Sequence, residues 1–294
     1  MDFNIPEELE SVKQLAAQIL SDFTAVEQLR QLEQQAEPFD GTLWQALAEA
    51  GLLGVDIEEA QGGTGLGFYA LTSLCEEVGR TVAAVPVVPV LVSAAGTLRR
   101  FAGDEQKEQL LPAIANGSLL VSAGLEEYNN DDPTRPACGA RSVEGGFALS
   151  GTKIGVSQAA RASRILVSAT TGEELVVALV DPNAAGVTLS PQVVTSGETR
   201  HELKLSEVQV PTEDIVAVGG KALQAMEWAQ QATRTALSAM AVGVCDKMMR
   251  ITGQYTSERE QFGRPIATFQ AVSHRVADCY IDVECLRLVT QQAT

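Results

Sequence analysis

A helical hydrophobic pattern that begins at Lys221 and continues for about 36 residues constrains this chain more than any other feature. Apolar residues recur every three or four positions, which predicts one long helix with a buried stripe. The stripe comprises Leu237, Met240, Ala241, Val244, Met248, Ile251 and Tyr255. We expect the helix to end near Phe262, with Pro265 just beyond it.

A second helical pattern starts near Thr268 and runs to the last residue without a stop signal. One face of it carries the apolar residues Phe269, Val272, Val276, Tyr280, Val283 and Leu286. Two long antiparallel helices leave an apolar face open. We therefore expect that the natural chain continues past residue 294 and adds more helices, or that a partner subunit covers this face.

The rest of the chain divides into a helical and a strand-rich part. Residues 1–118 carry helical patterns, beginning with the acidic first turn after Pro6. Residues 119–218 carry short β-branched runs separated by turn residues. The predicted fold is α+β, with an N-terminal helical domain (1–118), a small central β-barrel or sandwich (119–218) and the first two helices of a C-terminal bundle (219–294).

Composition excludes several classes of function. The formal net charge of −17 argues against a nucleic-acid partner and against docking on anionic membranes. Five scattered cysteines and two histidines give no pattern for a disulfide framework or a metal site. The segment Met1-Asp2-Phe3-Asn4 is not typical of a secretory leader. The longest apolar run, 82–92, is too short to span a membrane, so we expect a cytoplasmic protein.

Four motifs, in this order and spacing, resemble the acyl-CoA dehydrogenase family across nearly the whole chain. The motifs are Gly51-Leu52-Leu53-Gly54 with Gly62-Gly63-Thr64-Gly65 and Glu76-Glu77-Val78-Gly79-Arg80; residues 101–117 with Leu111-Pro112; Leu149-Ser150-Gly151-Thr152-Lys153-Ile154-Gly155-Val156-Ser157; and residues 257–266 followed by Phe269-Gln270. The resemblance implies an FAD-dependent enzyme that desaturates an acyl-CoA thioester between its α and β carbons. It also implies an electron-transfer flavoprotein as electron acceptor.

The resemblance implies roles for individual residues. Ser157 matches the position that hydrogen-bonds near flavin N5, and Arg259 would pair with the flavin diphosphate of a neighbouring subunit because guanidinium binds phosphate bidentately. Thr233 and Arg234 match positions that line the substrate pocket. The remaining positions implied in flavin binding are Leu125, Gly155, Val156, Gln261, Phe262 and Gln270.

Three positions depart from the family pattern. Glu126 stands where the family has threonine in its flavin-binding segment, and its negative charge opposes a nearby flavin or CoA phosphate. Gly155 stands where the family usually has an aromatic residue that shields the flavin. Thr233 stands at one of the two family positions for the catalytic glutamate, and the other position lies in a C-terminal segment that this chain lacks. We therefore assign no catalytic residue.

These departures are similar to those of the smaller subunit of heterotetrameric steroid side-chain acyl-CoA dehydrogenases. The first hypothesis is a subunit that shares a flavin site with a longer homologue, which brings the base. The alternatives are a homo-oligomeric dehydrogenase whose glutamate lies beyond residue 294, a non-catalytic scaffold subunit, and a flavin monooxygenase on the same fold.

Overall fold

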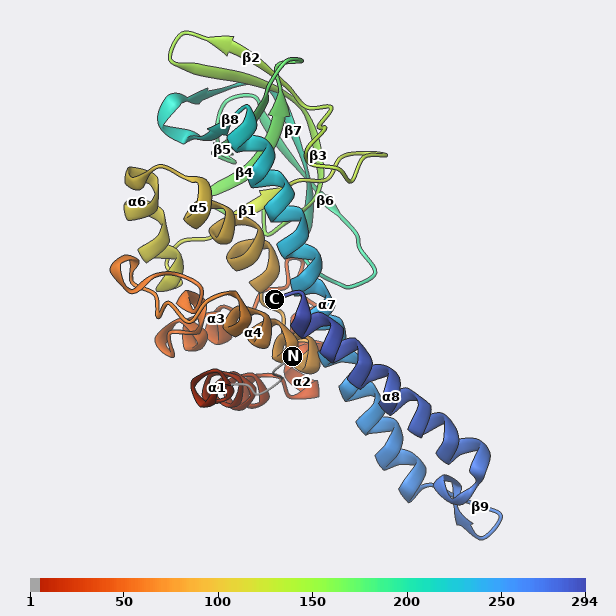
Figure 1. Cartoon of the computed structure of the whole chain (residues 1–294). Coiled ribbons are helices and arrows are strands. Elements are labelled where there is room, and N and C mark those ends of the chain that lie inside the picture. Colours follow the sequence, from red (N-terminus) through yellow and green to blue (C-terminus); the bar gives the residue numbers. More distant parts are fainter. Residues whose placement is uncertain (1–5) are drawn as a thin grey trace.

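The computed structural model describes residues 6–294, so the Met1–Asn4 segment that we judged not to be a secretory leader lies outside the described residues. Helices come first, a mixed sheet follows, and two long helices end the chain, as Figure 1 shows. The expected α+β fold and its order of parts are confirmed. Helix α7 runs past both the sheet and the N-terminal helices, and therefore connects every part of the molecule (Figure 1).

The N-terminal part is entirely helical. Its elements are α1 (Glu7–Phe23), α2 (Val26–Glu33), α3 (Gly41–Glu49), η1 (Leu52–Gly54), η2 (Glu59–Gln61), α4 (Phe68–Thr81), the π-helical turn η3 (Val88–Ala95), α5 (Gly96–Phe101) and α6 (Asp104–Ala115). Local signals explain several ends: the Asp40 carboxylate accepts a hydrogen bond from the Leu43 amide at 2.9 Å, which caps α3. Gly51 then ends that helix in the left-handed conformation.

The strands form one hydrogen-bonded path with the order β6-β7-β3-β2-β4-β5-β8, and β1 pairs with β4. They are β1 (Val121–Gly124), β2 (Gly139–Val143), β3 (Gly146–Ser157), β4 (Arg164–Thr170), β5 (Leu175–Val180), β6 (Val187–Gln192), β7 (Arg200–Pro211) and β8 (Ile215–Val218), with the short helix η4 (Thr212–Asp214) before the last. Strands β2 and β4 meet only at Gly139 and Thr170. The two halves on either side of this pair share one hydrophobic core.

Helix α7 (Gly220–Glu258) buries a different face from the one its large apolar residues predicted. The expected stripe is wrong, because Met248, Ile251 and Tyr255 are all more than half exposed. The buried face instead carries Ala222, Ala225, Met226, Ala229, Ala232, Ala236, Ala239, Val242, Gly243 and Asp246. Small residues prevail there because a Cβ atom on Gly243 would lie 1.9 Å from the Glu76 carbonyl oxygen of α4. The two helix backbones are therefore in direct contact.

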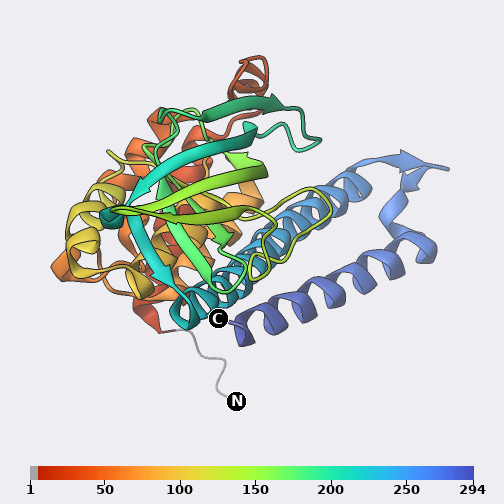
Figure 2. The ribbon, with the colours of Figure 1, turned by 90° about the horizontal axis from the view of Figure 1, so that it is seen from above.

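The far end of α7 and helix α8 (Gln270–Gln292) project from the body as a two-helix arm, which Figures 1 and 2 show from two directions. The tip between them consists of β9 (Glu260–Gln261), β10 (Arg264–Pro265) and η5 (Ile266–Thr268). Phe262 and Gly263 both have positive φ angles, which form the tight turn between the two short strands. Only Val283 and Thr290 of α8 are buried. The arm is thus largely exposed.

Candidate functional site

A cleft of about 180 Å³ lies between the sheet and the helices. The loop before η3 and η3 itself form one wall, α7 forms another, and the ends of β1 and β3 form the third. Its lining residues are Val85, Pro86, Val88, Pro89, Ser93, Ala123, Leu125, Glu126, Ile154, Gly155, Ser157, Glu198, Arg200, Thr233, Leu237 and Met240. The cleft thus brings together four of the ten residues that the resemblance implies: Leu125, Gly155, Ser157 and Thr233.

Ser157 is the residue of this cleft that is best suited to bind a ligand. It ends β3, where its backbone carbonyl accepts a hydrogen bond from the Ser122 hydroxyl at 2.5 Å. Its own hydroxyl makes no hydrogen bond within residues 6–294, although the residue is 5% exposed and lines the cleft. A hydroxyl in that situation can donate to a ligand atom. The side chain of Val156 points the other way, into the core of the sheet.

Gly155 has a left-handed backbone conformation, with φ at +64°. Side chains from distant strands occupy its polar groups: its amide donates to Gln192 Oε1 at 2.8 Å, and its carbonyl accepts from Arg200 at 2.9 Å. A Cβ atom on Gly155 would lie 3.4 Å from Glu126 Oε2. The space that an aromatic shield would require is therefore bordered by a carboxylate and a guanidinium.

Thr233 faces the cleft from α7, and its hydroxyl lies 2.8 Å from the hydroxyl of Ser93 in η3. Two neutral hydroxyl groups therefore stand at the helical position where a general base was sought. The two carboxylates that line the cleft, Glu126 and Glu198, come from the sheet side instead. Arg234 is exposed on α7 and lies outside this lining. The pKa of Asp132 lies below its ordinary value mainly because the carboxylate accepts hydrogen bonds from Thr134, and the charge of Arg234 makes a smaller contribution.

The other predicted flavin-binding residues, Arg259, Gln261, Phe262 and Gln270, lie at the tip of the arm. All four are exposed, and the side chain of Phe262 is 94% exposed. Thr233 and Arg259 belong to the cleft and the tip respectively, and 26 residues of chain between them give a separation of about 39 Å at 1.5 Å per residue. The predicted site residues therefore form two groups that are far apart within one chain.

The tip is nevertheless internally ordered. The Arg264 guanidinium lies 4.2 Å from the centroid of the Phe269 ring, and Phe262 meets that ring edge to face at 6.1 Å between centroids. The Ile266 amide donates to the Arg259 carbonyl at 2.9 Å. These contacts order the tip internally, while Arg259, Phe262 and Arg264 remain exposed on it.

A buried ion pair supports the cleft from behind. Lys153 is fully buried in β3, and its ammonium donates to Glu127 Oε1 at 2.7 Å. Burial alone would raise the pKa of the Glu127 carboxyl. The pKa nevertheless lies below its ordinary value, because Lys153 and the amides of Ala137 and Cys138 all donate to the carboxylate. The pair fixes β3 to the segment that carries Leu125 and Glu126.

Sequence reasoning missed three residues at this site: Ser93, which lines the cleft, and Gln192 and Arg200, which hydrogen-bond to Gly155. The last two act on Gly155 across 37 and 45 residues, so no local pattern indicated their role.

The structure also bears on metal binding and on membrane insertion. Within residues 6–294, no cluster of histidine, cysteine and carboxylate residues is arranged to hold a metal ion. No helix in the described part of the chain is long and apolar enough to cross a bilayer.

Comparison with known proteins identifies the family. Residues 6–118 match the N-terminal domain of acyl-CoA dehydrogenases and residues 221–294 match the C-terminal domain. The chain is 31% identical to the acyl-CoA dehydrogenase FadE27 of Mycobacterium tuberculosis over 293 residues, which cover 100% of this chain and 76% of that protein.

Two solved structures are also similar. One is a variant of the Tcur3481-Tcur3483 steroid ACAD, with 42% identity, a TM-score of 0.90 and coverage of 98% of this chain and 77% of the other. The other is the ChsE4-ChsE5 complex from Mycobacterium tuberculosis, with 30% identity, a TM-score of 0.91 and coverage of 99% and 78%. This chain therefore belongs to the acyl-CoA dehydrogenase family of FAD-dependent oxidoreductases.

Proposed function

We propose that this chain is a subunit of a heteromeric acyl-CoA dehydrogenase that desaturates a bulky, steroid-derived acyl-CoA thioester. In this proposal the chain and a longer homologue form a shared flavin site, and the homologue carries the catalytic base. The observation that carries the shared flavin site is the separation of the predicted flavin-binding residues into a cleft group and a tip group about 39 Å apart. One flavin cannot contact both groups of the same chain.

The tip group fits a flavin that is bound mainly by another chain. Arg259 supplies a guanidinium for the diphosphate, Gln270 supplies an amide, and Phe262 supplies an exposed ring. FAD, when bound, accepts the hydride that leaves the β carbon of the substrate. This chain's part is then to bind and orient the cofactor. The exposed face of α7 that carries Met248, Ile251 and Tyr255 gives the partner an apolar surface beside the tip.

The cleft group fits a flavin less well. Ser157 offers a free hydroxyl, but Glu126 adds a negative charge and Gly155 leaves one face unshielded. The helical base position holds the Thr233–Ser93 hydroxyl pair, which cannot remove an α proton at neutral pH. A partner that supplies a carboxylate therefore accounts for more of these residues than a self-sufficient enzyme does.

Two relatives support the heteromer and the substrate class. The Tcur3481-Tcur3483 protein is described as a steroid ACAD, and ChsE4-ChsE5 is described as a complex of two components. By analogy we assign the chain a longer partner of the same family. We also propose electron-transfer flavoprotein as the electron acceptor, a cytoplasmic location, and domain limits at 1–118, 119–218 and 219–294.

The visible absorption spectrum tests the proposal. The chain is purified alone and, separately, after co-expression with a longer acyl-CoA dehydrogenase homologue. We expect the flavin band only in the co-expressed complex, and we expect Arg259→Ala to weaken it. Flavin bound by the chain alone and bleached by an acyl-CoA would instead establish a self-sufficient dehydrogenase. A complex that retains its flavin and activity when Arg259 and Gln270 are both changed to alanine would reduce this chain to a scaffold.

A further inference from the structure

A network of charged side chains lies where the arm joins the body. It connects α1, α4, α7 and α8, and we call it the root cluster. Its members are Lys13, Glu76, Glu77, Arg80, Asp246, Arg250, Glu284 and Arg287. The side chain of Asp246 is 1% exposed, so this is not a surface ion pair of negligible effect. Such a network fixes the helices in one arrangement only while all its members are paired.

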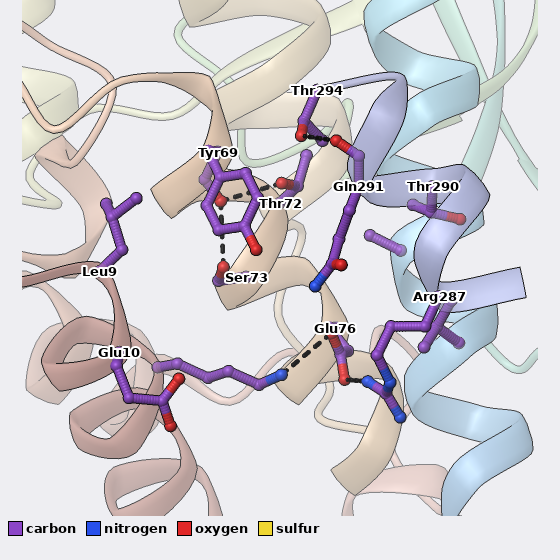
Figure 3. A pocket seen from close by; sticks show the side chains of 13 residues that line it. Leu9, Glu10, Tyr69, Thr72, Ser73, Glu76, Arg287, Thr290, Gln291 and Thr294 are labelled. Carbon is purple, nitrogen blue, oxygen red and sulfur yellow. Dashed lines mark hydrogen bonds and ion pairs between the residues drawn. The ribbon is translucent and has the colours of Figure 1, made fainter. Parts of the chain in front are cut away.

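Arg287 is the member by which α8 takes part in the network. Its guanidinium reaches Glu76 on α4, as Figure 3 shows, and it also lies 3.5 Å from Asp246 on α7 and 3.4 Å from Glu284 on α8. Burial alone would lower the pKa of Arg287, but the carboxylates of Glu76 and Glu284 raise it above its ordinary value. A single planar group therefore connects three helices.

Apolar packing holds α8 much less firmly. Val283 is its only buried apolar side chain, whereas Tyr280, Ile281 and Val289 are more than half exposed. Hydrophobic contact is not directional, so a single buried valine does not fix the C-terminal half of α8 against the body. Charged groups with fixed hydrogen-bond geometry do fix it. The position of this half of α8 against α4 and α7 therefore depends on Arg287.

We propose that Arg287 is a positioning residue for the flavin site, because it fixes the C-terminal half of α8 to α4 and α7 and thereby sets the direction in which the arm presents Arg259 and Gln270 at its tip. The inference rests on the proposed function of the tip. Arg287 lies 17 positions after Gln270, a distance of about 26 Å along the helix. A tilt of α8 by about 10° at Arg287 would therefore displace Gln270, and the tip that is attached to it, by about 4–5 Å.

The test compares Arg287→Met with Arg250→Met in the complex with the longer homologue. Arg250 is the matched control: it pairs with the same Asp246, but its side chain is 70% exposed and it connects no second helix. The complex is stripped of FAD, and FAD is titrated back while its fluorescence is recorded. We expect Arg287→Met to weaken FAD binding by about tenfold or more. We expect Arg250→Met to change it less than twofold.

Hydrogen exchange and a second variant separate positioning from loss of folding. Arg287→Met should speed amide exchange in 283–292 and leave the buried half of α7 unchanged. Arg287→Lys keeps the charge and should keep the complex assembled. It should nevertheless bind FAD more weakly than the wild type, because one ammonium group cannot contact both Glu76 and Asp246.

A double-mutant cycle decides whether Arg287 acts through the tip. If it does, adding Arg287→Met to Arg259→Ala should weaken FAD binding little further than Arg259→Ala alone. Fully additive losses would overturn the inference, as would unchanged exchange in α8 or an Arg287→Met complex that binds FAD normally. If Arg259→Ala itself leaves FAD binding unchanged, the proposed role of the tip is wrong, and the role of Arg287 is wrong with it. If only the Arg287 variants behave like the wild type, the role of the tip stands and the role of Arg287 alone is wrong.

Discussion

At the scale of single residues, the cleft depends on a few positions where the backbone conformation or a buried charge restricts which residue can be accommodated. Gly155 is held in the left-handed region while both of its backbone polar groups are bonded to side chains from other strands. Lys153 and Glu127 are buried together behind it. The loss of stability on substitution at these positions should therefore depend on backbone conformation and charge, and not only on the size of the new side chain.

Substitutions at Gly155 should follow left-handed propensity. We expect Gly155→Ala to lower the free energy of unfolding by about 1–2 kcal/mol, because its nearest new contacts, at 3.4 and 3.7 Å, are ordinary ones and only the backbone is strained. Asparagine should cost less than alanine, and valine should cost more. Urea unfolding of the three variants checks this order, and an order that followed side-chain volume alone would contradict the assigned backbone conformation.

The buried pair predicts how stability changes with pH. Since the folded pKa of Glu127 is depressed below its reference value of 4.5, the pair stabilises the fold above that pH and loses its effect as the pH falls through the folded pKa. We expect Glu127→Gln to cost about 3–5 kcal/mol at neutral pH, because it leaves Lys153 buried and unpaired. Urea midpoints of wild type and variant should converge on acidification.

Glu207 provides the control for that experiment. Its pKa is also lowered, first by the hydrogen bond from Arg141, but the pair is exposed. Glu207→Gln should therefore change the midpoints little at any pH. An equal effect of the two substitutions would mean that burial does not explain how much the Lys153–Glu127 pair contributes to stability.

At the scale of elements, the sequence predicted the helical and strand-rich parts and the two long helices. Local signals also account for single elements: the hairpin around Gly145, the strand at 175–180 and the helix at 104–115 have turn or cap residues at their ends. Helix α2 and the π-helical turn η3 were missed, since Pro86 and Pro89 interrupt the apolar run that contains η3. The prediction of which face of α7 is buried was wrong because both faces carry apolar residues, and only tertiary packing decides which face is covered.

The close contact between α4 and α7 predicts a large difference between two glycines of one helix. Gly243→Ala should lower the free energy of unfolding by about 1–3 kcal/mol, because its Cβ atom would overlap the Glu76 carbonyl. Gly253→Ala should instead raise it by up to about 1 kcal/mol, since no atom lies within 4 Å and alanine favours helix. Thermal or urea unfolding measures both, and equal effects would contradict the packing described for α7.

The candidate site illustrates the same limit of sequence reasoning. Motifs identified Leu125, Ser157 and Thr233, and the structure brings them to one cleft. They did not reveal that the tip residues lie far from that cleft, because this depends on the straightness of α7 over 39 residues. They also did not identify Arg200, which reaches Gly155 from a strand distant in sequence.

At the scale of the whole molecule, the exposed apolar face of the arm predicts assembly with another chain. Replacing Met248 and Ile251 together by serine should leave the free energy of unfolding of the isolated chain within about 0.5 kcal/mol. It should weaken assembly with the longer homologue by at least about tenfold. Val193→Ser is the control, because that fully exposed valine lies in the loop between β6 and β7 and is not part of the arm. Sedimentation velocity measures assembly, and a double variant that assembles normally would exclude this face.

The arm also has the mechanical properties of a lever. Its base is the root cluster at Asp246, and Arg259 lies 13 positions, or about 20 Å, farther along the chain, so a rotation of about 5° at the base would displace Arg259 by about 2 Å. That displacement is enough to break a hydrogen bond. A small rotation at the root, such as a substitution there would cause, is therefore magnified at the tip. The length of the arm makes the position of the tip sensitive to the packing of residues that lie far from it.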